Sequence, residues 1–121
     1  MRRFLLALAT VASLGVVAVS VATATATPTR VVHLSAPVSG LRYDQKVVRA
    51  RSGKIKITFV NRSSLKHNVN VEQGEKEFGK SSTIGRGTTT FVVTLKPGKY
   101  NFYCSVPGHE DAGMHGTLIV S

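Results

Sequence analysis

The sequence predicts an all-β protein built as an antiparallel β-sandwich. Short segments rich in β-branched and aromatic residues recur at even spacing, and several of them alternate apolar with polar residues. No segment beyond the N-terminal region has the periodicity of a convincing amphipathic helix. Many short strands joined by turns are typical of two packed sheets.

Length and composition limit the chain to one domain. It has 121 residues, 16 Lys and Arg against 6 Asp and Glu, a net charge of +10, four His and one Cys. A single Cys excludes an internal disulfide, and it also excludes zinc sites built on two or four cysteines. Hydrophobic residues make up 42% of the chain, which argues against disorder despite the charge.

The N-terminal segment has the pattern of a secretory signal peptide. The basic stretch Met1-Arg2-Arg3 precedes an apolar run over 4–21, and small residues follow over 22–28. We expect residues 1–26 to be the signal, with cleavage after Ala24 or Ala26. The alternative is a retained membrane anchor, because 18 residues is the short limit for a spanning helix.

Cleavage would leave a domain over 27–121 that is secreted or periplasmic. Losing Arg2 and Arg3 lowers the net charge from +10 to +8. A free thiol is unusual in a secreted protein, and a domain of this size buries only a modest core. Both considerations favour a bound metal that uses the cysteine and fastens the fold.

The first predicted strands lie in the N-terminal half of this domain. Residues 31–36 form a β-branched run. Residues 54–60 alternate strictly, which places Ile55, Ile57 and Phe59 on one face and lysines on the other. Residues 67–72 also alternate, and their apolar face carries His67 with Val69 and Val71.

The C-terminal half continues the pattern. Residues 73–87 are polar and contain glycine, so we expect a long connection there. A strand over 88–95 follows, then a turn at Lys96-Pro97-Gly98-Lys99. A strand over 99–104 puts Tyr100, Phe102 and Cys104 on one face, and 116–121 forms the last strand.

Residues suited to bind a metal occur at two places. His67 lies on the inward face of its strand, and the loop after residue 103 carries Cys104, His109 and Met114 as Cys-x4-His-x4-Met. Pro107, Gly108 and Gly113 supply bends that let so short a loop wrap one ion. A thiolate with two imidazoles and a thioether suits copper in electron transfer, whereas zinc gains little from methionine.

These motifs resemble the cupredoxins, the small blue-copper family of plastocyanin, azurin and auracyanin. The resemblance rests on Tyr100-x-Phe102-x-Cys104, on x4-His109-x4-Met114 after it, and on His67-Asn68 upstream. It runs from about Tyr43 through Val120, and the combination most resembles auracyanin-like secreted bacterial cupredoxins. It implies a Greek-key β-sandwich with one mononuclear type 1 copper ion.

The resemblance also implies a role for each site residue. His67, Cys104 and His109 would form the trigonal plane around copper, and Met114 would be the weak axial ligand. Asn68 would tie the first ligand strand to the Cys104 loop near Ser105. A proline common in the family before the second strand is replaced by Asp44-Gln45-Lys46. We expect that departure to affect an edge of the sandwich and not the site.

The other two histidines are expected to lie outside the ligand set. His33 has no partner at ligand spacing, so a surface or packing role is expected. His115 directly follows Met114 and should point the opposite way.

Four protein ligands leave no open position for a substrate, so we expect an electron carrier and not an enzyme. The alternative is a copper storage, delivery or resistance protein with the same site. The ring edge of His109, among Val106, Pro107, Ala112 and Gly113, is where the resemblance implies that electrons pass.

We expect the protein to be a monomer and its partner to be another redox protein. The positive charge could steer the protein towards an acidic partner or an anionic membrane surface. Nucleic-acid binding is not expected, because no aromatic residues alternate with the basic ones. The predicted signal peptide also directs the protein out of the cytoplasm, away from nucleic acids.

Overall fold

The computed structural model describes residues 12, 14–23 and 30–121. Residues 12 and 14–23 are exposed and form no helix or strand. The predicted cleavage positions, Ala24 and Ala26, lie outside the described residues. Within the described ranges, no helix is long and apolar enough to cross a membrane.

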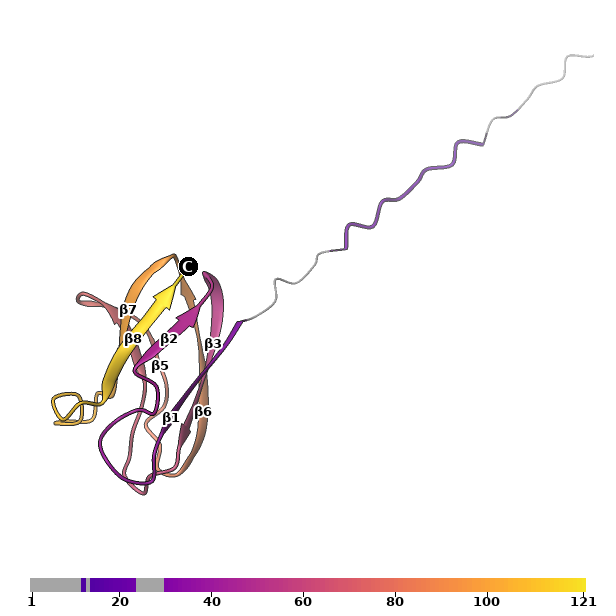
Figure 1. Ribbon diagram of the computed structural model, residues 1–121. Helices are drawn as coiled ribbons and strands as arrows, with labels where there is room; N and C mark the ends of the chain where they lie inside the picture. Colours follow the sequence, from indigo (N-terminus) through magenta and orange to yellow (C-terminus); the bar gives the residue numbers. More distant parts are fainter. Residues whose placement is uncertain (1–11, 13, 24–29) are drawn as a thin grey trace, which may run out of the picture.

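The part of the chain that the structure describes from residue 30 onward forms eight strands in two sheets (Figure 1). One sheet has the order β1-β3-β6 and the other has the order β2-β8-β7-β4-β5. The strands are β1 (Arg30–Ala36), β2 (Val47–Ala50), β3 (Gly53–Asn61), β4 (Asn70–Gln73), β5 (Lys76–Lys80), β6 (Gly87–Leu95), β7 (Gly98–Tyr103) and β8 (His115–Val120). The predicted all-β sandwich is confirmed.

The predicted alternation positions the core between the sheets. In β3, Ile55, Ile57 and Phe59 are buried while Lys54 and Lys56 are exposed. In β7, the aromatic side chains of Tyr100 and Phe102 are buried on the same face, and the adjoining Cys104 continues that face. Because strands such as β3 and β7 bury every second residue, the hydrophobic effect holds the two sheets together.

The antiparallel arrangement that we expected is only partly correct. β1 pairs with β3 in parallel, and β2 pairs with β8 in parallel, while the other pairings are antiparallel. The chain leaves β1, contributes β2 to the opposite sheet and returns as β3. This crossover between sheets lets β3 run in the same direction as β1, which a hairpin cannot do.

The expected long connection over 73–87 is wrong in part, because it contains β5. Gly74, with φ of 60°, turns the chain so that β5 pairs with β4 as an edge hairpin. Only Phe78 in β5 carries a large apolar side chain, so the segment lacks the alternation by which a buried strand is identified. The short edge strand β2 was not predicted from its own residues for a similar reason.

The predicted strand over 67–72 starts later in the structure. β4 begins at Asn70, and His67 instead forms an isolated antiparallel bridge with Ile84. The inward face is nevertheless as predicted, since His67, Val69 and Val71 are all buried.

Candidate metal centre

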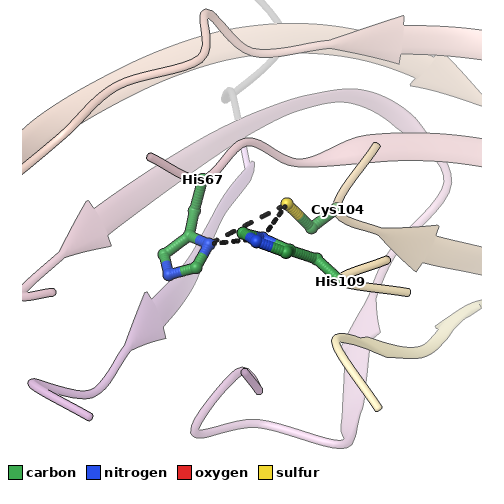
Figure 2. Close-up of side chains that lie close together, drawn as sticks. All are labelled: His67, Cys104 and His109. Carbon is green, nitrogen blue, oxygen red and sulfur yellow. Dashed lines mark hydrogen bonds between the residues drawn. The ribbon is translucent and has the colours of Figure 1, made fainter. Parts of the chain in front are cut away.

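Three of the predicted ligand side chains meet at one end of the sandwich. Figure 2 shows the two imidazole rings and the thiol of His67, Cys104 and His109 turned toward one another. The two Nδ1 atoms lie 3.1 Å apart. The Cys104 sulfur lies 3.7 Å from Nδ1 of His109 and 4.0 Å from Nδ1 of His67.

Backbone hydrogen bonds fix where each of these side chains begins. The N–H of His67 donates to the carbonyl of Ile84, and the N–H of Ile84 donates back, both at 2.9 Å. Cys104 directly follows β7, and its N–H donates to the carbonyl of Met114 at 3.0 Å. That bond places Met114 next to Cys104 across the base of the loop.

The loop between β7 and β8 is a series of tight turns (Figure 1). The N–H of His109 donates to the carbonyl of Val106, and the N–H of Met114 donates to the carbonyl of His109, both at 3.0 Å. Gly108 and Gly113 have φ of 81° and 113°, which other residues adopt only with strain. The glycines thus give the loop the compact form that brings His109 over Cys104.

Burial separates the four predicted ligands into two kinds. His67, Cys104 and Met114 are each 0% exposed, whereas His109 is only partly buried. Burial, and secondarily the nearby His109, lower the pKa of His67, so its ring is held neutral with a lone pair available for a metal. Its Nε2 is buried and has no hydrogen-bond partner among the described residues.

The spacing of the three donor atoms suits a transition-metal ion. A triangle with sides of 3.1, 3.7 and 4.0 Å encloses a point about 2.1 Å from all three corners, close to typical metal–imidazole and metal–thiolate distances. Two nitrogens and a soft sulfur in one plane are the donor set of a blue-copper site when a weak axial thioether accompanies them. The buried thioether of Met114 belongs to the same loop.

The expected bridge from Asn68 to the Cys104 loop is present. The side-chain amide of Asn68 donates to the hydroxyl of Ser105 at 2.8 Å, and its Oδ1 accepts the N–H of Ser105 at 2.8 Å. Asn68 also donates to the hydroxyl of Thr83 and accepts from Asn70. The residue after His67 is therefore bonded to the residue after Cys104.

Sequence patterns did not identify Tyr43, whose hydroxyl also holds Asn68 in place. Its hydroxyl donates to the carbonyl of Asn68 at 2.5 Å, and its ring packs edge-on against Phe59 and Phe102. Burial, with smaller contributions from Cys104 and Glu110, raises the pKa of Tyr43, so the hydroxyl remains a donor. Tyr43 lies between β1 and β2, outside any strand, so no alternation indicated its burial.

The expectation that residues 44–46 affect only an edge is wrong for Lys46. Its ammonium donates to the carbonyl of Gly113 at 3.1 Å, and its own carbonyl accepts the N–H of Thr117 at 2.9 Å. Lys46 therefore contacts the backbone on both sides of Met114. The cause is the parallel pairing of β2 with β8, which brings the start of β2 beside the ligand loop.

The remaining histidines lie as predicted, outside the cluster. His33 and His115 are both exposed, while Met114 beside His115 is fully buried.

Comparisons with known proteins agree with this geometry. A profile of the copper-binding proteins of the plastocyanin/azurin family matches residues 30–121. A comparison with curated protein sequences finds no significant match.

Several solved structures are similar to the chain. Reduced auracyanin from Roseiflexus castenholzii is 23% identical with a TM-score of 0.71, covering 79% of this chain and 99% of that chain. Auracyanin A, a blue copper protein from Chloroflexus aurantiacus, is 20% identical with a TM-score of 0.71, covering 78% and 100%. Rusticyanin from Thiobacillus ferrooxidans is 18% identical with a TM-score of 0.62, covering 78% and 79%. At these identities the likeness shows the fold.

Proposed function

Because the chain belongs to the plastocyanin/azurin family of copper-binding proteins, we propose that it is a one-electron carrier. Its ligands to a single type 1 copper ion would be His67, Cys104, His109 and Met114. The ion, when bound, supplies electron transfer by changing between Cu²⁺ and Cu⁺. The chain itself supplies the donor atoms, their fixed positions and the exclusion of water.

The observation that carries this proposal is the convergence of three donor side chains, two of them fully buried, at one end of the sandwich. The donor atoms of His67, Cys104 and His109 lie 3.1–4.0 Å apart. The carbonyl of the fully buried Met114 accepts a hydrogen bond from the N–H of Cys104. A site filled by protein donors has no position for a substrate, which argues against catalysis. Burial of Cys104 and His67 also disfavours the more highly charged oxidised form, which raises the potential.

Electrons would pass through His109, because it is the one partly exposed member of the proposed ligand set. Pro107 and Ala112, both exposed, and the half-buried Val106 give this part of the loop a small apolar surface. Glu110 and Asp111 are exposed in the same loop and make it locally acidic. A redox partner can therefore dock at His109 without depending on the overall positive charge.

The alternative, copper storage or delivery, requires the site to release its metal to an acceptor. His67 and Cys104 are fully buried, and hydrogen bonds on both sides of Cys104 hold its position. Release would therefore require the loop to open, which favours a carrier that retains its ion.

We also propose that residues 1–26 are a signal peptide and that the domain acts outside the cytoplasm. The support is the sequence pattern alone: a basic start, an apolar run and small residues before Pro28. Mass spectrometry of the protein from an exporting host would give the N-terminus directly. Cleavage after Ala24 or Ala26 is expected, and an intact N-terminus would favour the anchor.

Repeated redox cycling separates the two functions. The copper-loaded chain is oxidised and reduced many times in the presence of a Cu⁺ chelator, and the copper that remains bound is measured. A carrier gives a reversible voltammetric wave and retains its copper. Loss of copper to the chelator on each reduction would instead assign the chain to delivery.

A further inference from the structure

Three arginines gather at the end of the sandwich that is remote from the candidate metal centre. Arg30, Arg49 and Arg51 surround a shallow hollow of about 420 Å³, whose lining is completed by Val31, Ala50 and Ser121. They come from the start of β1, from β2 and from the turn after it, so the fold brings distant parts of the sequence together.

The backbone under this cluster is well fixed. The N–H of Ser121 donates to the carbonyl of Ala50 at 3.0 Å, and the N–H of Ser52 donates to the carbonyl of Ser121 at 2.8 Å. Arg49 and Arg51 are two residues apart, and both are exposed. The Arg30 side chain lies over the β2–β3 turn. One of its guanidinium nitrogens is 3.7 Å from the point that a Cβ on Gly53 would occupy.

None of the ion pairs in the described part of the chain involves this cluster. The ion pairs found there join Arg42 and Arg62 to Asp44, and Lys80 to Glu77. Arg30, Arg49 and Arg51 take part in none of them. Their guanidinium groups are thus available to an external anion.

The arginine cluster and the proposed copper loop lie at opposite ends of β8. Ala50 pairs with Val120 at the end of β8, whereas the loop over 104–114 joins its start. The six residues of β8 separate the two ends by about 20 Å. A redox protein that docked on the arginines would therefore be held far from His109.

We propose that this cluster binds the phosphate groups of an anionic lipid surface. Guanidinium groups offer paired N–H donors that match phosphate oxygens, and each cation near an anionic membrane adds to the attraction. Arg30 is also the first residue of β1, so the chain that follows the N-terminal segment joins the sandwich at this end. Binding in this orientation turns the 104–114 loop away from the bilayer.

The test measures how the copper-loaded chain partitions onto vesicles. One set of vesicles is pure phosphatidylcholine, and the other contains one third phosphatidylglycerol. The readout is the ratio of the two partition coefficients, because this ratio isolates the part of binding that depends on headgroup charge. Replacing Arg30, Arg49 and Arg51 by Gln should lower this ratio on the order of a hundredfold, about fivefold for each cation.

A charge-matched variant distinguishes a defined surface from net charge. Lys66, Lys80 and Arg86 are exposed and lie outside the cluster, so their replacement by Gln removes the same charge. This variant should keep most of the preference for anionic vesicles. An equal loss in both variants, or no preference in the parent chain, would overturn the proposal. Capture by polyglutamate without any vesicle preference would also overturn it and assign the cluster to a protein partner.

The visible absorption of bound copper reports whether the variants fold. The three arginines lie about 20 Å from the ligand loop along β8, so their replacement should leave that absorption unchanged.

Discussion

At the level of single residues, Asn68 joins the two segments that carry the buried donors. Its side chain takes part in four hydrogen bonds, to Ser105 twice, to Thr83 and to Asn70. Asn68 follows His67, and Ser105 follows Cys104, so these bonds fix the distance between two proposed ligands before any metal binds.

Replacing Asn68 by Ala should therefore destabilise the protein even without copper. We expect the free energy of unfolding of the copper-free chain to fall by about 2–3 kcal/mol, because several bonds are lost and the buried Asn70 amide loses an acceptor. Urea denaturation measures this loss. Asn101→Ala is the control, since that side chain has one long bond of 3.4 Å to Glu72 and should cost less than 1 kcal/mol, or about a third as much. Equal losses in the two variants would contradict the role given to Asn68.

Lys46 acts at the proposed axial ligand. The carbonyl of Gly113 accepts from the ammonium of Lys46 at 3.1 Å and from the N–H of His115 at 2.9 Å. The second of these bonds closes a three-residue turn centred on Met114. Lys46 thus holds the turn that determines where the thioether lies.

Removing this contact should change the electronic signature of bound copper. Lys46→Gln should alter the EPR spectrum and the ratio of the visible bands, because these depend on the axial ligand. Lys46→Arg, which keeps a donor and the charge, should restore them. Lys66→Gln removes an exposed charge beside His67 without a bond to the loop, so it should shift the potential alone. Identical spectra for Lys46→Gln and Lys66→Gln would show that Lys46 acts by charge only.

The sequence predicted the proposed ligands, but it did not predict most of the residues whose hydrogen bonds hold those ligands in place. His67, Cys104 and His109 could be predicted to converge because their order and spacing place them on one strand and its expected partner loop. Tyr43, Thr83 and Lys46 lie in irregular segments, where no periodicity relates a residue to its neighbours in space. Their roles depend on how β2 pairs with β8 and on how 81–84 lies beside His67.

At the level of elements, Gly116 of β8 lies against Phe102 of β7 and against the backbone of Lys46, just before β2. A Cβ there would lie 2.7 Å from the carbonyl oxygen of Lys46 and would clash with the ring of Phe102. Phe102 is fully buried, and the carbonyl belongs to the backbone, so neither can move without disturbing the core.

Gly116→Ala should lower the free energy of unfolding by about 1–3 kcal/mol through overpacking. Thermal denaturation of the copper-free chain gives the change. Gly85→Ala is the matched control, because nothing lies within 4 Å of its Cβ position, and this variant should be as stable as the parent. A fully stable Gly116→Ala would mean that the strands are not packed this closely.

Strand prediction succeeded for β3 and failed for β2 and β5. β3 runs through the core with one face fully buried, and its strict alternation predicted it closely. β2 and β5 are edge strands whose residues are mostly exposed or half-buried, so their patterns carry little information. Parallel pairing was missed because alternation indicates a buried face and says nothing of strand direction.

At the level of the whole molecule, the family, the sandwich and the copper cofactor implied by the sequence are confirmed. The three clustered donors all come from the five-stranded sheet and the segments next to it: His67 before β4, Cys104 after β7 and His109 before β8. A metal that joins them would tie two connections, β3–β4 and β7–β8, at one end of the sandwich. Because the fold already holds these side chains together, binding should add to its stability by mass action.

The most direct test of the proposed centre is the spectrum of the protein with Cu²⁺. The purified chain is titrated with one equivalent of Cu²⁺, and its visible absorption and EPR spectra are recorded beside those of Cys104→Ser. A thiolate bound to copper in a trigonal site predicts an intense blue colour and an EPR signal with unusually small copper hyperfine splitting, both absent from Cys104→Ser. A colourless protein with the ordinary tetragonal copper signal would contradict the assignment of His67, Cys104, His109 and Met114 as a type 1 copper site.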